Sequence, residues 1–251
     1  MYSTDLSNTQ WQFIKSSLNF KERKRKFDLR TIWNALHYII KTGCQWRMLP
    51  VNFPKWELVY YYYSKWASLE IYDLILEKLR GKVRVKMGQN AEASLGIMDS
   101  QSVRWGNNRA LNGIDGNKKV KGIRRHTIVD KNGFLIAVMV CVANINDGKA
   151  ALLLMRIIKE FLCSIKVILA DGGYRGELAD SVKQIYGYVI KVVMRTDNEG
   201  GFKPVNKRWV IERTFAWFDN DRRLCRNYEL LAESSETMVK LSAIKLLLNK
   251  I

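Results

Sequence analysis

The stretch VILADGGYRGEL, residues 167–178, decides how the fold of this chain is interpreted. A short, almost entirely apolar run ends at one acid, Asp171, and two glycines follow directly. Apolar runs of this length are typical of a strand that is covered on both faces of a sheet. We therefore expect a buried strand that carries Asp171 to the edge of a sheet. Gly172 and Gly173 would let the chain turn there without crowding a metal ion or a phosphate.

The same pattern occurs in SLGIMDSQSV, residues 94–103, where Asp99 lies near the end of an apolar run. After a polar loop at 104–122, the pattern predicts a hairpin at 123–144 with an Asn-Gly turn. It then predicts helices at 147–162, 177–187, 207–224 and 233–250, and strands at 165–173 and 188–195. This succession predicts an α/β fold with a ribonuclease-H-like mixed sheet, although other α/β sheets fit it as well.

The first 80 residues are predicted to be helical. Helices are expected at 3–18, at 29–42, where Gly43 suits the stop, and, as one continuous helix, at 55–79, after Pro54. The helices at 29–42 and 55–79 resemble a helix-turn-helix module that contacts DNA, but an ordinary helical subdomain with an aromatic core fits as well. A polar, basic stretch from Arg80 is interpreted as a boundary. We therefore predict a helical domain at 1–80, a linker at 81–93 and a catalytic domain at 94–251.

The charge of the chain indicates its partner. Lys and Arg number 42 against 24 Asp and Glu, which gives a net charge of +18. A balance this basic favours a polyanionic partner, above all nucleic acid. The four cysteines are scattered and there are only two histidines, which argues against a zinc site or a disulfide framework. The polar start and the lack of a long apolar run predict a cytoplasmic, nucleoid-associated protein with no membrane partner.

Asp99 and Asp171 are predicted to meet. If their strands are neighbours, the two carboxylates lie side by side, and both can stay ionised only beside a cation. Magnesium fits, because it prefers oxygen ligands and is held by one or two carboxylates together with substrate phosphates. A third acid, Glu212, lies in an apolar and aromatic helix. It is either a surface ion-pair partner of Arg208, four residues earlier, or a third metal ligand.

Three carboxylates could hold two metal ions, Mg²⁺ or alternatively Mn²⁺. One ion would activate water or a DNA 3′-hydroxyl, and the other would stabilise the leaving oxygen during in-line attack on phosphorus. From the residues alone, this chemistry indicates a metal-dependent nuclease or a DNA strand transferase.

Four motifs carry a family resemblance, in the order GIMDSQSVR (96–104), DGNKKVKGIRRHTIVDKNGF (115–134), VILADGGYRGEL (167–178) and KRWVIERTFAWFDNDRRLCRNYE (207–229). Together with the N-terminal TIWNALHYIIKTGCQWRMLP (31–50), they resemble the DDE transposases of bacterial insertion sequences, most of all the insertion-sequence-five family. The resemblance implies a catalytic triad of Asp99, Asp171 and Glu212. It also implies metal-dependent hydrolysis at the element ends, attack of the freed 3′-hydroxyl on target DNA, and a homo-oligomer, a dimer, on paired terminal inverted repeats.

Nine basic residues are candidates for contacts with double-stranded DNA, although those of the 117–126 loop could simply be solvated. The family's third motif has a tyrosine and a lysine where this chain has Val205 and Asp219, and Asn220 follows. We therefore expect arginines further along to supply phosphate contacts. Two alternatives stay open, a nuclease without strand transfer and an inactive, domesticated DNA-binding derivative. The nine candidates are Lys118, Lys119, Lys121, Arg124, Arg125, Arg175, Arg208, Arg222 and Arg223.

Overall fold

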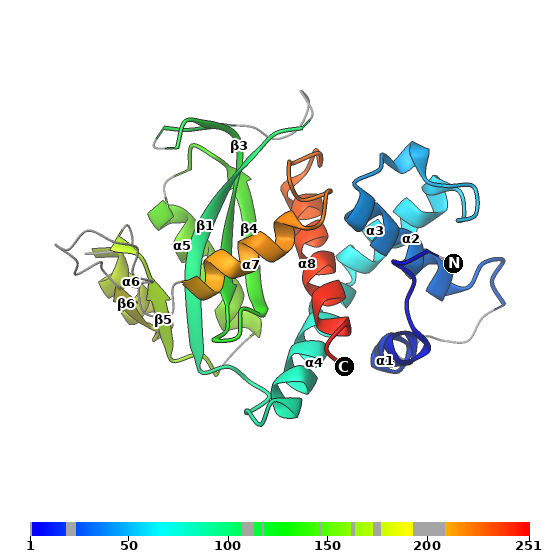
Figure 1. Ribbon diagram of the computed structural model, residues 1–251. Helices are drawn as coiled ribbons and strands as arrows, with labels where there is room; N and C mark the ends of the chain where they lie inside the picture. Colours follow the sequence, from blue (N-terminus) through cyan, green and yellow to red (C-terminus); the bar gives the residue numbers. More distant parts are fainter. Residues whose placement is uncertain are drawn as a thin grey trace.

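The chain folds into a mixed sheet flanked by helices and joined to an N-terminal group of helices (Figure 1). The computed structural model describes residues 2–18, 24–106, 113–116, 118–145, 147–161, 164–172, 177–192 and 209–251. No helix in these ranges is long and apolar enough to cross a membrane.

The sheet has six strands: β1 (Leu95–Arg104), β2 (Gly113–Asp115), β3 (Val120–Val129), β4 (Leu135–Val142), β5 (Val167–Ala170) and β6 (Val189–Val192). β3 lies between β1 and β4 and is antiparallel to both, whereas β1, β5 and β6 are parallel neighbours. The short β2 pairs with the beginning of β3. The predicted mixed α/β sheet is therefore confirmed, with a meander followed by strands that helices connect.

Helices cover both faces of the sheet. α5 (Asp147–Phe161) and α6 (Glu177–Tyr186) pack on one face, in a core that includes Met98 of β1 and Ile168 of β5. α7 (Trp209–Asp219) and α8 (Ala232–Leu248) cover the other face, in a core that includes Ile97 of β1. Successive residues of a strand point to opposite faces, so the nearly continuous apolar runs of β1 and β5 serve both cores.

The N-terminal helices differ from the prediction. They are α1 (Asn8–Leu18), α2 (Leu29–Thr42), the 3₁₀ turn η1 (Trp46–Met48), α3 (Trp56–Ser68) and α4 (Ile71–Lys86). The single helix expected at 55–79 is wrong, because the chain breaks at Glu70, whose φ of 53° is left-handed. The break lets α4 pack against α8 and α1. α4 also continues to Lys86, so the stretch expected as a linker from residue 81 begins inside a helix.

Aromatic side chains fill the interior of this helical region. The fully buried Trp33 of α2 stacks on Trp66 of α3 at 5.2 Å between ring centroids, and Tyr72 of α4 meets Trp33 edge-on. α2 ends as expected at Gly43, whose φ is 70° and whose N–H donates to Ile39. These aromatic side chains therefore form a core, as expected for an ordinary helical subdomain. DNA contact by this region stays a prediction.

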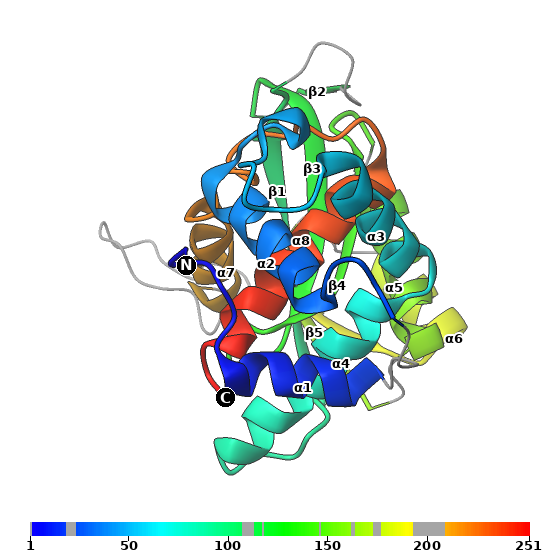
Figure 2. The ribbon, with the colours of Figure 1, turned by 90° about the vertical axis from the view of Figure 1, so that its right-hand side faces the viewer.

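α8 links the two parts of the chain. It packs against β4 on one side and against α4 and α2 on the other, and Figure 1 shows it between the sheet and the N-terminal helices. Figure 2 shows the same arrangement from the side, with α2 in front of α8 and the sheet behind. One apolar cluster therefore runs from Ile14 of α1 through α8 to Val129 of β3. The helical region and the sheet share a continuous core.

The loop expected at 104–122 is partly ordered into strands. β1 continues to Arg104, and β3 begins at Val120. The two strands approach closely at Gly122, where a Cβ atom would lie 2.0 Å from the Val103 carbonyl oxygen. The polar composition concealed this pairing, because the contact depends on backbone atoms and on the missing side chain of a glycine.

His37, buried in α2, predicts a pH dependence of stability. Burial lowers its pKa to about 3, and repulsion by Lys245 acts in the same direction. The unfolded imidazole titrates near 6.5, so the stability it contributes is complete above about pH 6.5 and declines toward pH 3. Between pH 7 and pH 4.5, we expect wild type to lose about 2–3 kcal/mol more than His37→Leu in urea unfolding. Equal losses in both proteins would contradict this assignment.

Candidate active site

Asp99 and Asp171 lie at equivalent positions just beyond the paired residues of β1 and β5. Ile97 of β1 pairs with Leu169 of β5 in parallel, and the two aspartates come two residues later on each chain. Side chains two residues apart in a strand share a face, and neighbouring strands lie about 5 Å apart. Ile97 and Leu169 both pack in the core beneath α7 and α8. The two aspartates therefore project from adjacent strands toward the face that α7 covers.

The position of Asp99 differs slightly from the prediction. The apolar run ends before it, but β1 continues for five more residues, so Asp99 lies in the middle of the strand. Its carboxylate accepts a hydrogen bond from the Ser100 N–H at 2.7 Å. Asp171 directly follows the last residue of β5, as the sequence predicted.

Glu212 lies in the first turn of α7, on an exposed part of the helix. α7 contacts β1 and β3, and its buried residues, such as Ile211 and Phe215, belong to the same core as Ile97. Figure 1 shows α7 crossing β1, with its amino-terminal end on the side of β5. Glu212 is therefore on the helix that covers the aspartate face, at the end nearest the β1–β5 pair.

Asp99, Asp171 and Glu212 do not lie close enough together in the structure to form a metal-binding cluster. Within the described ranges, no three His, Cys, Asp or Glu residues are grouped closely enough to hold a metal ion. The two aspartates nevertheless fit a hard divalent cation, because they offer carboxylate oxygens from adjacent strand positions. The structure thus places Asp99 and Asp171 two residues beyond a paired position of adjacent strands, and it places Glu212 on the covering helix but outside a ligand cluster of the described residues.

Asp219 ties the end of α7 to β1. Its two carboxylate oxygens each lie 3.4 Å from the Gln101 side-chain nitrogen, which projects from the same face of β1 as Asp99. Asp219 and Glu212 are seven residues apart, close to two helical turns, so they share a side of α7. Asp219, which replaces the family's lysine, therefore has a partner in Gln101 of β1. This contact holds the side of α7 that carries Glu212 against β1.

The basic loop before β3 lies beside this site. The Lys118 ammonium is 3.4 Å from the Ser100 carbonyl oxygen, one residue from Asp99. Lys119 and Lys121 are exposed, and so is Arg222, which follows α7. These four positions are compatible with the predicted DNA contacts.

Three of the predicted DNA-binding arginines are buried and occupied by partners within the protein. Arg124 pairs with the buried Asp115 at 2.5 Å, and Arg223 pairs with Glu229 at 2.8 Å. Arg125 is 1% exposed and donates to the Leu224 carbonyl oxygen. Arg124 and Arg125 are neighbours in β3, which is buried on both faces from Gly122 to Val129, and Arg223 lies in the segment after α7, so no alternation in the sequence marks them as buried. Their burial does not fit the prediction of phosphate contacts.

Arg124 helps to stabilise the charged form of its partner, Asp115, inside the protein. Burial raises the pKa of Asp115, but hydrogen bonds from Ser102, Arg124 and the Lys118 N–H outweigh it and hold this pKa well below its usual range. Asp115 thus joins β1, β2 and β3 as an ionised acceptor. The last two predicted DNA contacts, Arg175 and Arg208, lie outside the described residues.

A basic hollow next to β1 was not predicted from the sequence. It has a volume of about 390 Å³ and is lined by Arg104, Trp105, Lys119, Lys121 and Arg226. Arg226 reaches it because the backbone of Asn227 pairs with Arg104 and Gly106. The sequence offered a weak indication for Arg104 and Trp105, because they lie at the end of the strand that carries Asp99. It offered no indication for Arg226, because only a tertiary contact brings the segment of Arg226 to β1.

Comparisons with known proteins agree with these features. A family model described as "Putative transposase of IS4/5 family" matches residues 6–76, and one described as "Transposase DDE domain" matches residues 90–243, more than half of the chain. A relative from Burkholderia cepacia, named "Putative transposase for insertion sequence element IS402", is 31% identical over 153 residues, covering 58% of this chain and 70% of the relative. The resemblance of the four motifs is confirmed, and the chain belongs to the DDE transposase family.

Proposed function

We propose that this transposase binds the terminal inverted repeats of an insertion sequence, cleaves the ends hydrolytically and joins the 3′-hydroxyl to target DNA. The observation that supports the proposal is the β1–β5 pairing of Ile97 with Leu169 beneath α7, since Asp99 and Asp171 each follow two residues later. Glu212 joins them as the third acid, because it lies on the helix that covers this face.

The strand order supports a ribonuclease-H-like sheet. An antiparallel meander of β4, β3 and β1 is extended by the parallel strands β5 and β6, with helices on both faces. In such a sheet, residues after the carboxyl ends of parallel strands line the ligand site. Asp171 occupies that place after β5.

DDE transposase domains generally use divalent metal ions, and we assign Asp99, Asp171 and Glu212 as the ligands of up to two Mg²⁺ or Mn²⁺ ions. Bound ions would supply a nucleophile at neutral pH and stabilise charge on the phosphate oxygens. The two aspartates fix the position of the scissile phosphate relative to β1. Gln101 and Asp219 hold α7 in place, and so keep Glu212 beside that position.

The DNA backbone is proposed to run along β1 from the aspartates to the basic hollow. Lys118 lies beside Ser100, and Arg104, Lys121 and Arg226 line the hollow five residues further along the strand. Five strand residues span about 17 Å, close to five base-pair steps of a duplex. These exposed cations would neutralise phosphates, with a second copy of the chain on the paired end.

The test uses the purified full chain with Mg²⁺ and a labelled duplex that carries the DNA flanking the coding region. We expect nicks at the element end, followed by covalent joining of that end to a target plasmid. Cleavage without joining would identify a nuclease and overturn the strand-transfer step. Binding without cleavage, in Mg²⁺ and in Mn²⁺, would identify an inactive DNA-binding derivative.

A further inference from the structure

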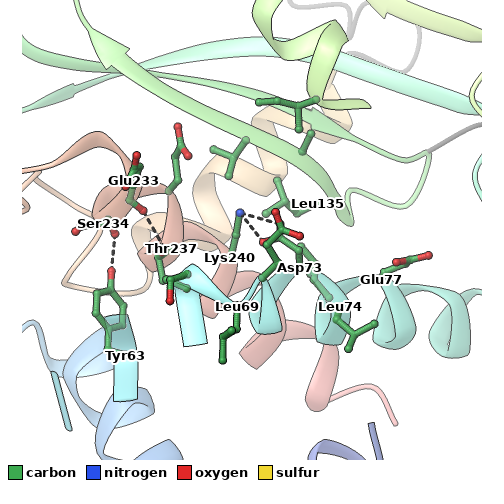
Figure 3. Close-up of a pocket in the computed structure, with 18 of the residues that line it drawn as sticks. Tyr63, Leu69, Asp73, Leu74, Glu77, Leu135, Glu233, Ser234, Thr237 and Lys240 are labelled. Atoms are coloured by element: carbon green, nitrogen blue, oxygen red, sulfur yellow. Dashed lines mark hydrogen bonds and ion pairs between the residues drawn. The ribbon is translucent and has the colours of Figure 1, made fainter. Parts of the chain in front are cut away.

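A groove lies between the N-terminal helices and the sheet. Its volume is about 720 Å³, and its lining side chains come from α3, α4, α5, β4, α8 and the residues beside these elements (Figure 3). Asp99, Asp171 and Glu212 are not among the lining residues. Sites for small organic molecules are concave, have volumes of about 300–1,000 Å³, and are mostly apolar with a few polar groups. The groove therefore has the size of such a site and is distinct from the candidate active site.

Apolar side chains form much of the lining. Leu69, Leu74 and Leu231 line the groove and are 59%, 40% and 60% exposed. Ile136 of β4 and Ile158 of α5 line it as well, and both are buried in the core of the sheet. Single exposed leucines are ordinary, but several gathered around one hollow are typical of a binding site. The groove thus offers apolar surface to the hydrocarbon part of a ligand.

The charge of the groove is opposite to that of the molecule. Five of its lining residues are acidic and two are basic, whereas basic residues exceed acidic ones by 42 to 24 in the whole chain. Both bases are engaged within the protein. Lys240 pairs with Asp73 at 2.7 Å, and the buried Arg80 donates to the Leu135 carbonyl oxygen at 2.9 Å. The excess of carboxylates therefore favours a cationic ligand.

The carboxylates are spread along the groove. Glu70, Asp73 and Glu77 are three and four residues apart, so they lie on one side of α4. Glu70 and Glu77 are about 10 Å apart along the helix axis. Glu233 comes from the first turn of α8, and Figure 3 shows it on the other side of the Asp73–Lys240 pair from Glu77. Glu70, Glu77 and Glu233 are exposed and form no ion pair with other described residues.

We propose that this groove binds a linear aliphatic polyamine. Glu70, Glu77 and Glu233 would bind its ammonium groups, and the methylene segments between them would pack on Leu69 and Leu74. A single compact cation would meet only one of the separated carboxylates, and an uncharged ligand would leave all of them without a partner. The proposal goes beyond the transposition chemistry and does not depend on it.

The net charge of the chain makes binding of a polycation informative. A chain of +18 repels polycations over most of its surface, so binding in the absence of DNA requires a local excess of carboxylates. The ligand would contact α4 of the N-terminal helices as well as α8, which packs against the sheet. A ligand that binds only the folded chain stabilises it by mass action, so the polyamine should also raise the Tm.

Equilibrium dialysis of the full chain against spermidine, a linear triamine, tests the proposal without DNA or metal ions. Wild type is expected to bind one spermidine per chain, with a dissociation constant that rises with salt. Butylamine, which has a single amine, should bind at least tenfold more weakly. Glu77→Lys should weaken spermidine binding at least tenfold. Glu57→Lys, the same charge change at an exposed position of α3 outside the groove, should leave binding unchanged.

A further variant separates the apolar contribution from charge. Leu74→Ser keeps the charge of the groove but removes apolar surface, so it should weaken spermidine binding about threefold or more, with the salt dependence of wild type. Leu74 and Glu77 are exposed, and circular dichroism should show both variants folded. A wild type that binds no spermidine would overturn the proposal. So would equal weakening in Glu77→Lys and Glu57→Lys, or displacement of spermidine by an equal concentration of Mg²⁺, because either would show a response to charge alone.

Discussion

Asp171→Asn is expected to abolish metal-dependent cleavage of element ends while leaving DNA binding intact. The substitution keeps the size of the side chain but replaces an anionic ligand by a neutral amide, which holds Mg²⁺ weakly. Because a bound ion contributes several kcal/mol to the transition state, the cleavage rate should fall on the order of 10³-fold or more. Single-turnover cleavage measures the rate, and gel shift of the same duplex measures binding.

Asp99 gives the complementary test. Asp99→Cys should be inactive with Mg²⁺, which prefers oxygen ligands, and should recover activity in Mn²⁺, which accepts thiolate more readily. Asp180→Asn, an exposed acid on α6, is the matched control and should cleave as wild type does. Full activity of Asp171→Asn would show that the carboxylate pair is not the metal site. Loss of DNA binding in the same variant would instead indicate a structural role.

Asp130→Ala should cause the largest loss of stability. The fully buried Asp130 carboxylate pairs with Arg84 of α4 and accepts from the Asn132 and Phe134 N–H groups of the β3–β4 turn. Removing it leaves the Arg84 guanidinium buried without its counter-charge. Loss of one partner of a buried pair typically costs about 3–5 kcal/mol, and urea unfolding measures it.

Two comparisons decide whether the buried pair is responsible. Asp180→Ala removes an exposed carboxylate, so it should change the free energy of unfolding by less than about 0.5 kcal/mol. Combining Asp130→Leu with Arg84→Met removes both charges and should restore much of the loss. If Asp130→Ala and Asp180→Ala unfold at the same urea concentration, α4 does not depend on this pair for its contact with the sheet.

Local patterns in the sequence predicted the sheet and its helices, because apolar periodicity and turn residues act over a few positions. The VILA run before Asp171 forms β5, Gly43 ends α2, and the Asn132-Gly133 turn joins β3 to β4. The break at Glu70 was missed, since no glycine or proline marks it. Its left-handed backbone is stabilised by the packing of α4 on α8, which is a contact between residues far apart in the chain.

The sequence by itself determined the family, the basic charge and the two aspartates at the ends of apolar runs, because these depend on residue identity and order. Only the tertiary structure decided which charged side chains are exposed to a partner and which are buried inside the protein. The pairing of β1 with β5 placed Asp99 and Asp171 on adjacent strands, two residues beyond Ile97 and Leu169. The packing around β3 and the segment after α7 buried Arg124, Arg125 and Arg223. Burial and register depend on which elements become neighbours, and no local pattern contains that information.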